Sequence, residues 1–354
     1  MTTPSLLVTV TGATGFIAGH TIAQLLARGH RVRATVRNPD KHAELAHLRA
    51  LPGAERLELV AADLQRPGAF DAAVAGADAV LHMASPYVLD AADPQKELVD
   101  PAVNGTRNVL RSCARAPSIR RVVVTSSMAA VTDEPGSDRP LTEDDWNTKS
   151  TLTRNPYYYS KTLAERAAWD FVRDETPRWD LVVINPFLVI GPSLSPGLNT
   201  SNKIFVDLLG GQYPAIMDLT WGFVDVRDVA AAHVRAIETP AAAGRYLCAG
   251  DTISMRAVVE LLAKEGAPGT LPKRGLDCAA GNQLVKVSSY FQPKGVGSYL
   301  RTHVGRVPRY DTSKIQRDLG LAFRPVPETI RETIADLVRW GHLPAKGKAG
   351  AQAA

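Results

Sequence analysis

Short apolar segments alternate with helical patterns throughout the first half of the chain, and this alternation limits the possible folds more than any other feature. Helical patterns at 17–28, 98–115 and 157–173 lie between several of these segments. Because strands and helices that alternate form βαβ units, we expect an α/β fold with a parallel, doubly wound sheet. The six segments are rich in β-branched residues and nearly continuously apolar, as strands covered on both faces are: residues 6–10, 31–36, 56–61, 78–83, 120–126 and 180–185.

The regular alternation ends after Pro186, where Pro and Gly become frequent. Further elements are indicated at 223–238 (a strand end and a helix), 244–250 (a strand), 254–265 (a helix) and 327–340 (an amphipathic helix). We therefore expect a nucleotide-binding lobe over residues 1–186, to which 222–250 return. A smaller C-terminal substrate-binding lobe would comprise 187–221 and 251–342. Residues 343–354 are small and polar, and we expect them to be disordered.

The cysteine content, the net charge and the first apolar run argue against several classes of protein. The three cysteines are far apart and odd in number, which indicates neither a disulfide framework nor a metal site and fits a reducing, cytoplasmic setting. The formal charge of +5 comes from scattered basic residues, so a small anionic molecule is favoured over nucleic acid. The first apolar run has five residues and no basic segment before it, so we expect neither a signal peptide nor a membrane span.

A glycine-rich turn, TGATGFIAGH, follows the first strand and opens a helix. In a Rossmann-type dinucleotide fold such glycines let the backbone approach a pyrophosphate, and the helix N-terminus beyond them binds anions. The alternative is a turn with only a structural role. The residues expected to contact the dinucleotide here are Gly12, Thr14, Gly15, Phe16 and Ile17.

The end of the second strand distinguishes between cofactors. Arg37 ends VRATVR, Lys41 follows, and no acid precedes Asp40. A guanidinium matches a 2′-phosphate in charge and geometry, whereas NAD-specific sites place an acid there. This favours NADP(H), although Arg37 and Lys41 could also be ordinary surface cations. Asp63 and Leu64, just past the third strand, are expected to contact adenine.

Three consecutive tyrosines in NPYYYSKTLAERAAW raise the possibility of acid–base chemistry. A helix places residues four apart on one face, and only Tyr157 has a lysine, Lys161, at that spacing. The ammonium group would favour the phenolate and lower the pKa of the tyrosine, as a proton donor at neutral pH requires. Tyr158 and Tyr159 are then expected to pack or to line a pocket.

These segments together resemble the extended short-chain dehydrogenase/reductases. The resemblance is strongest to the branch of dihydroflavonol 4-reductase, cinnamoyl-CoA reductase and the fungal and bacterial aldehyde or ketone reductases. It covers residues 5–250 and 311–325, and the motifs that carry it are VTGATGFIAGH, VRATVRNPDK, AADL, HMASP, VVVTSSMAAV, YYYSKTLAERAAW and INPFLVIGPS.

The resemblance implies an NADP(H)-dependent carbonyl reductase with a Ser–Tyr–Lys triad. Its catalytic residues would be Ser127, Tyr157 and Lys161, with Ser126 as the competitor for the serine role. It also implies that Ala84, Ser85, Pro186 and Val189 border the cofactor, beside Tyr157 and Lys161 themselves. The serine would donate to the substrate carbonyl oxygen as negative charge develops there.

The expected substrate wall is apolar and aromatic, which suits aromatic or bulky aliphatic carbonyl compounds. It comprises Tyr87, Met128, Phe187 and Trp221, with Phe205 or Tyr290 as further possibilities. The alternatives are a 3β-hydroxysteroid dehydrogenase-like enzyme, a nucleotide-sugar epimerase or dehydratase, and a non-catalytic NADP sensor. Partners other than the small-molecule substrate are not expected, and the protein would be a monomer or a homodimer.

Overall fold

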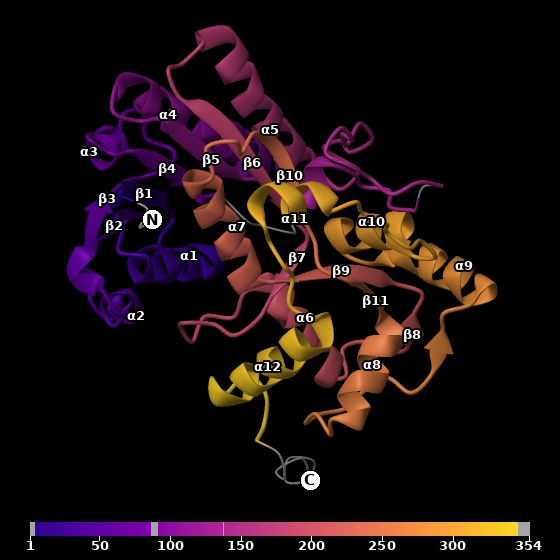
Figure 1. Cartoon of the computed structure of the whole chain (residues 1–354). Helices are drawn as coiled ribbons and strands as arrows, with labels where there is room; N and C mark the ends of the chain where they lie inside the picture. Colours follow the sequence, from indigo (N-terminus) through magenta and orange to yellow (C-terminus); the bar gives the residue numbers. More distant parts are fainter. Residues whose placement is uncertain (1–3, 86–90, 137, 346–354) are drawn as a thin grey trace.

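The computed structural model describes residues 4–85, 91–136 and 138–345. Its large sheet has seven parallel strands (Figure 1). In spatial order they are β10 (Gly244–Cys248), β6 (Asp180–Pro186), β5 (Arg121–Thr125), β4 (Ala79–His82), β1 (Leu7–Thr11), β2 (Arg31–Val36) and β3 (Leu57–Ala61). The six apolar segments and the segment 244–250 all contribute strands to it. The expected doubly wound sheet is therefore confirmed.

Helices cover both faces of this sheet (Figure 1). On one face α1 (Phe16–Ala27) packs against α7 (Val226–Glu238), and their apolar sides bury a core with β1, β2 and β10. On the other face α4 (Asp100–Arg115) packs against α5 (Pro156–Glu175) over β5 and β6. Cys113 of α4 lies fully buried in this second core, and burial raises the pKa of its thiol. The short elements in the first 130 residues of the chain are α2 (Ala46–Arg49), η1 (Ala54–Arg56), α3 (Asp71–Val74), η2 (Gln95–Val99) and η3 (Met128–Ala130).

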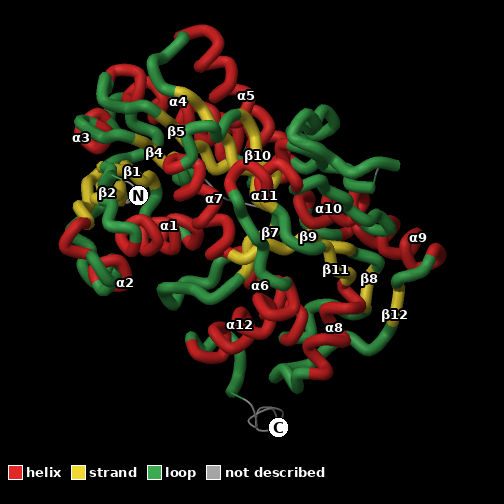
Figure 2. Tube along the Cα trace, viewed as in Figure 1, coloured by secondary structure: helices red, strands yellow, loops and turns green. Residues whose placement is uncertain are grey.

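A smaller lobe is built around a three-stranded sheet in the order β11 (Thr252–Ser254), β9 (Thr220–Asp225), β7 (Leu188–Ile190). Figure 2 shows its helices around this sheet. Its own apolar core includes Phe205, Trp221 and Phe223. The remaining elements of the lobe are α6 (Thr200–Leu209), β8 (Ile216–Met217), α8 (Met255–Lys264), β12 (Gly275–Leu276), α9 (Ala279–Ser288), η4 (Ser289–Phe291), α10 (Lys294–His303) and α12 (Val326–Arg339).

The chain passes between the two lobes more often than the sequence pattern indicates. The expected return at 222 begins inside β9, which belongs to the small sheet, so only α7 and β10 lie on the large one. Helix α11 (Ser313–Leu319), which falls within the expected substrate lobe, packs against α7 and β10. At the C-terminal end Leu343 is buried in the core of the smaller lobe, whereas residues 346–354 lie outside the described residues. Among the described helices, none is both long and apolar enough to cross a bilayer.

Candidate active site

The order of the strands reverses between β1 and β4, which is where doubly wound sheets bind their ligands. At this point Gly12 has a φ of +73°, and a Cβ on it would lie 2.9 Å from the Ala84 Cα. Only glycine fits there, because both its conformation and the close approach of the two strand ends exclude a side chain. Gly15 then caps α1 with its backbone and contributes no side chain. The first N–H groups of α1 therefore point into an open site that suits an anion.

A loop of the smaller lobe lies over this turn. A cavity of about 210 Å³ separates the two, with Thr14, Gly15 and Phe16 on one side and residues 193–195 and 197–199 on the other. The Ser193 backbone N–H donates to the Asp336 carboxylate at 2.7 Å, and the Pro192 carbonyl lies 2.9 Å from the His20 Nε2. The loop is thus held against both lobes, and a dinucleotide in the cavity would touch both. Sequence analysis did not identify it, because its Ser–Pro–Gly composition resembles that of any surface loop.

The residues expected to select the cofactor lie at the ends of β2 and β3. Arg37 is exposed, and no hydrogen bond or ion pair joins its guanidinium to another described residue. Lys41 is also exposed and pairs with Glu44 at 2.7 Å. Asp63 accepts a hydrogen bond from the Gln65 backbone at 2.9 Å, and the neighbouring Leu64 is partly buried beneath α4. Arg37 is therefore the better placed of the two cations for an added phosphate group.

The end of β4 is held in place by Thr11. Its hydroxyl accepts from the backbone N–H groups of Met83 and Ala84, both at 3.0 Å, and lies 2.9 Å from the His82 Nδ1. Burial, and secondarily the charge of Lys161, lowers the pKa of His82 to about 3. The neutral imidazole can then accept the proton of Thr11. This contact fixes the backbone of Ala84 and the residue that follows it, Ser85.

Lys161 joins α5 to the end of β4. Its ammonium donates to the Ser85 hydroxyl at 2.8 Å and lies 5.7 Å from the centre of the Tyr157 ring. Burial lowers the pKa of Lys161 to about 8, so the ammonium form predominates at neutral pH. The spacing of four residues has brought the side chains of Tyr157 and Lys161 together as expected. The lysine ammonium and the tyrosine ring lie at the carboxyl edge of the sheet.

The two candidate serines have different surroundings. Ser126 is buried, and its hydroxyl donates to the Glu165 carboxylate at 2.5 Å. The Ser127 hydroxyl is partly exposed and accepts from the Ala129 backbone at 3.1 Å, which leaves its own proton for another acceptor. The turn after Ser127 lies against α5, where the Thr162 hydroxyl donates to the Tyr158 carbonyl at 2.8 Å and lies 3.5 Å from the Ala129 carbonyl. Ser127 is therefore the serine whose proton is available beside this helix.

A buried ion pair supports the strand ends from below. Glu165, one turn after Lys161 on α5, pairs with Arg245 of β10 at 2.6 Å and accepts from Asn185 of β6 at 2.7 Å. Asn185 also donates to the Ser127 carbonyl at 3.2 Å. The network thus connects α5, β6, β10 and the serine turn. Glu165 could have been suspected from its spacing, since it continues the face that carries Tyr157 and Lys161, but its partners are distant in the sequence.

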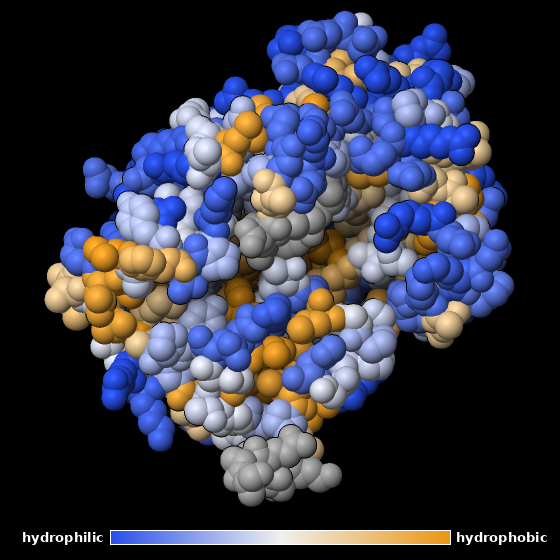
Figure 3. All heavy atoms as spheres, turned by 180° about the vertical axis from the view of Figure 1, so that it is seen from behind, coloured by the Kyte–Doolittle hydropathy of each residue, from blue (hydrophilic) through white to orange (hydrophobic). Residues whose placement is uncertain are grey.

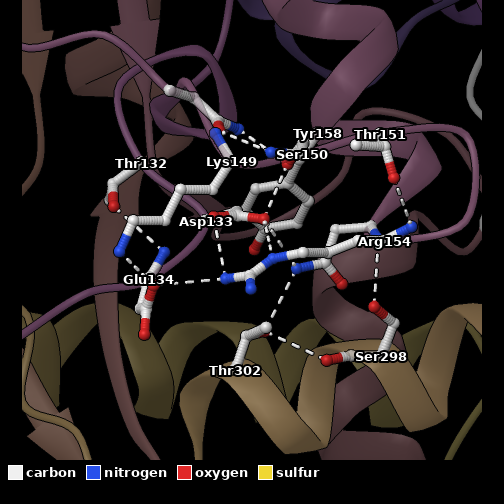
Figure 4. Close-up of polar contacts among 12 residues, drawn as sticks. Thr132, Asp133, Glu134, Lys149, Ser150, Thr151, Arg154, Tyr158, Ser298 and Thr302 are labelled. Atoms are coloured by element: carbon white, nitrogen blue, oxygen red, sulfur yellow. Dashed lines mark hydrogen bonds and ion pairs between the residues drawn. The ribbon is translucent and has the colours of Figure 1, made fainter.

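The first turn of α5 is anchored to the smaller lobe (Figure 4). Asn155, the residue before the helix, has a φ of 49°, and its backbone N–H donates to the Ser298 hydroxyl at 3.0 Å. Its side-chain amide donates to the Thr302 hydroxyl at 3.1 Å and lies 3.4 Å from the Asp133 carboxylate. All four residues are buried, and Asp133 is also paired with Arg154 at 2.9 Å. Helix α10 therefore fixes the position of the turn that carries Tyr157.

The expected substrate wall is only partly assembled among the described residues. Met128 and Phe187 belong to one apolar cluster, in which the Phe187 ring lies 5.3 Å from the Tyr310 ring. Trp221 is buried in the core of the smaller lobe against Phe223, and this position gives no support to a role in a pocket wall. Tyr87 lies outside the described residues. Pro186 is buried at the end of β6, and Val189 is buried in β7.

No group of three or more His, Cys, Asp or Glu side chains among the described residues is arranged to hold a metal ion. The geometry is instead that of a dinucleotide site with a Tyr–Lys pair at its edge.

A sequence profile of the NAD dependent epimerase/dehydratase family matches residues 8–249. The chain belongs to this family. Within it, the branch is that of the dihydroflavonol and cinnamoyl-CoA reductases, as the sequence resemblance implied.

Curated relatives match nearly the whole chain. Cinnamoyl-CoA reductase CAD2 of Medicago truncatula is 39% identical over 338 residues, which cover 94% of this chain and 95% of the relative. Tetraketide alpha-pyrone reductase 1 of Arabidopsis thaliana is 39% identical over 345 residues, which cover 95% and 96%. Among solved structures, the NADPH complex of Gre2 from Candida albicans superposes with a TM-score of 0.78 at 31% identity, covering 95% of this chain and 99% of the other. The family is one of NAD(P)-dependent enzymes, and the two curated relatives are named reductases.

Proposed function

We propose that this protein is an NADPH-dependent carbonyl reductase that reduces an aldehyde or ketone with an aromatic or bulky apolar group. The observation that carries the proposal is the Lys161 ammonium, which lies beside the Tyr157 ring and is held by Ser85 at the strand edge where dinucleotides bind. The names of the similar proteins, cinnamoyl-CoA reductase and the NADPH complex of Gre2, agree with this chemistry.

The residues at the edge of the sheet fit a dinucleotide. A Cβ at Gly12 would fill the space where the strand ends approach, and the uncapped start of α1 offers N–H groups to a pyrophosphate. Arg37 would hold the 2′-phosphate, and Asp63 and Leu64 the adenine. When bound, NADPH supplies the hydride that the carbonyl carbon receives. The chain itself has to orient the carbonyl group and deliver a proton to its oxygen.

In this mechanism Tyr157 donates the proton. Lys161 stabilises the phenolate that remains, because a nearby ammonium favours the charged form of the phenol. Ser127 donates a hydrogen bond to the carbonyl oxygen and stabilises the negative charge that develops there. Glu165 and Asn185 do not touch the reacting atoms; they position the serine turn and α5. Thr132 lies five positions after Ser127, where the dihydroflavonol reductases that this sequence resembles carry an amide side chain. A general aldehyde or ketone is therefore the proposed substrate.

Substitution of the acid tests the proposal. Tyr157→Phe should lower NADPH oxidation in the presence of a carbonyl substrate at least about a hundredfold, with little change in NADPH affinity. The panel comprises aromatic aldehydes, α-dicarbonyls, aryl ketones, a steroid ketone and a dihydroflavonol. Tyr159→Phe is the matched control, because it removes a phenolic hydroxyl from the same helix two residues later, and this variant should remain active. Near-normal turnover of Tyr157→Phe would refute the assignment.

The outcome of that panel also separates the rival functions. Turnover of the steroid ketone alone would indicate a hydroxysteroid dehydrogenase-like enzyme. If the protein binds NADPH but oxidises it with no carbonyl compound, the epimerase, dehydratase and sensor alternatives return, and nucleotide sugars should be screened next.

Substitution of Arg37 tests the cofactor preference. Arg37→Ala should weaken NADPH binding about tenfold to a hundredfold, because hydrogen bonds to a charged group are lost, while NADH binding changes little. Binding is measured by titration of cofactor fluorescence. Lys41→Ala is the control, since Lys41 pairs with Glu44 and should matter less. Equal losses for NADPH and NADH would exclude a 2′-phosphate role for Arg37.

A further inference from the structure

Helix α9 has apolar residues on two sides, only one of which is covered. Its buried side comprises Gly281 and Val285 and continues into Ser289 of η4. A second set, Leu284 and Val287, recurs at helical spacing and continues to Phe291. The exposed fractions of these three side chains are 57%, 61% and 88%. A surface helix normally directs polar residues outward, so this face requires an explanation.

The exposed residues form a concentrated patch. Of the eight large hydrophobic side chains that are exposed among the described residues, six fall between residues 284 and 307. Besides those on α9 and its end, they are Tyr290, Val296 and Val307. Figure 3 shows apolar atoms gathered at its left edge, where α9 and η4 lie after the half-turn from Figure 1. We call Leu284, Val287, Tyr290, Phe291 and Val296 the α9 patch. Exposed apolar surfaces of this kind mark interaction sites.

The segment of the chain that carries the α9 patch is basic. Residues 278–310 contain five Lys or Arg and no Asp or Glu. Lys286 and Lys294 lie on the same two helices as the patch, and the Arg301 guanidinium lies 4.5 Å from the centre of the Tyr290 ring. The surface is therefore both apolar and basic.

A cavity adjoins this surface. It has a volume of about 570 Å³, and Lys286, Arg306 and Arg309 line it together with Val307 and the acidic Asp138. Arg306 is paired with Glu134. Within the described part of the chain, no ion pair involves the side chains of Lys286 or Arg309. The cavity thus offers two cations to an anionic group at the border of the apolar patch.

We propose that the α9 patch docks the protein on an anionic lipid surface. The apolar side chains would enter the interface between headgroups and acyl chains, while Lys286, Lys294 and Arg309 contact anionic headgroups, as in amphipathic helices that lie in a membrane surface. A second copy of the chain is a poorer occupant. A twofold interface would place this basic surface against itself, and like charges repel. The docking is peripheral and requires no spanning segment, and it does not depend on the proposed reductase activity.

Vesicle co-sedimentation of the full chain tests the proposal. The protein should bind vesicles of phosphatidylcholine with phosphatidylglycerol and should bind pure phosphatidylcholine vesicles much more weakly, with a dependence on salt. The double variant Val287→Ser/Phe291→Ser should bind the anionic vesicles at least about tenfold more weakly, because two apolar side chains no longer leave water. Leu152→Ser, which removes an exposed leucine elsewhere, is the matched control.

Both variants change exposed side chains, and both should fold and oxidise NADPH with a soluble substrate as the unmodified protein does. Absence of binding to anionic vesicles would overturn the proposal, as would equal binding by the double variant. A dimer that forms without vesicles and is lost in the double variant would assign the patch to self-association instead. Retention on immobilised polyglutamate without vesicle binding would assign it to an acidic protein partner.

Discussion

Substitutions of Asn155 should lower the stability of the protein by amounts that depend on which of its interactions each substitution removes. Its φ of 49° and ψ of 62° are left-handed, a conformation that costs an ordinary residue about 1–2 kcal/mol and that asparagine tolerates. Its amide also donates to Thr302 at 3.1 Å and approaches Asp133 at 3.4 Å. Each hydrogen bond contributes about 1 kcal/mol.

Three substitutions separate these contributions. Asn155→Gly keeps the conformation but loses the hydrogen bonds, and should destabilise the protein by about 1–2 kcal/mol. Asn155→Ala loses both and should be worse, at about 2–4 kcal/mol. Asn155→Asp keeps the shape and the left-handed tolerance but places a second carboxylate beside buried Asp133. We expect it to be the least stable of the three unless one carboxyl is protonated.

Thermal unfolding gives the order of stability, and steady-state kinetics give the effect on α5. Because this turn carries Tyr157, the kcat for carbonyl reduction should fall by up to about a hundredfold in Asn155→Gly, whereas the KM for NADPH stays nearly constant. An alanine variant as stable as the glycine variant would refute the role of the left-handed conformation. An aspartate variant as stable as the unmodified protein would refute the contact with Asp133.

Two further substitutions follow from the site. Lys161→Met should abolish turnover and yet stabilise the cofactor-free protein at pH 7, because burial lowers the pKa of the lysine to about 8 and the charged form therefore opposes folding. Between pH 8 and the pKa of the unfolded lysine, the unfolded chain binds more protons than the folded one, so the unmodified protein gains stability as pH rises through this range. The stability advantage of the methionine variant should therefore shrink. Thermal unfolding at pH 7 and pH 9.5 checks this, and an advantage that grows with pH would contradict it. Gly105→Ala should raise the Kd for NADPH several-fold at unchanged kcat, because the added Cβ would lie 2.5 Å from the Leu64 Cγ and displace the proposed adenine wall. The double variant Gly105→Ala/Leu64→Ala removes this clash, and fluorescence titration should show affinity restored to that of Leu64→Ala alone.

The large sheet and the residues on its edge could be predicted because their signals are local. Buried parallel strands are continuous apolar runs, and a turn between a strand and a helix requires glycine where backbones approach, as at Gly12. The pair of Tyr157 and Lys161 follows from helical spacing alone. The sequence signal for each of these features lies within one short segment, so the sequence pattern and the structure agree on them.

Other features depend on contacts between distant residues and could not be predicted in that way. Arg245 and Glu165 are 80 residues apart in the sequence, and no pattern in the residues around either one indicates that they form a buried pair. Helices α9 and α10 lie in a segment rich in Gly, Pro and Lys, where packing against the smaller lobe outweighs weak helix propensity. Trp221 shows the same limit, because an aromatic residue next to a motif can line a pocket or fill a core. Only the surrounding packing distinguishes the two.

The repeated passage of the chain between the lobes has a consequence for engineering. The smaller lobe comprises separate segments, and α7, β10 and α11 return between them to the large sheet. A lobe built in this way cannot be cut out or exchanged as one contiguous cassette. Specificity grafts from a related reductase would have to transfer individual loops, such as residues 193–199 or the segment around α9 and α10. A protease that nicks one connection should leave the two halves associated.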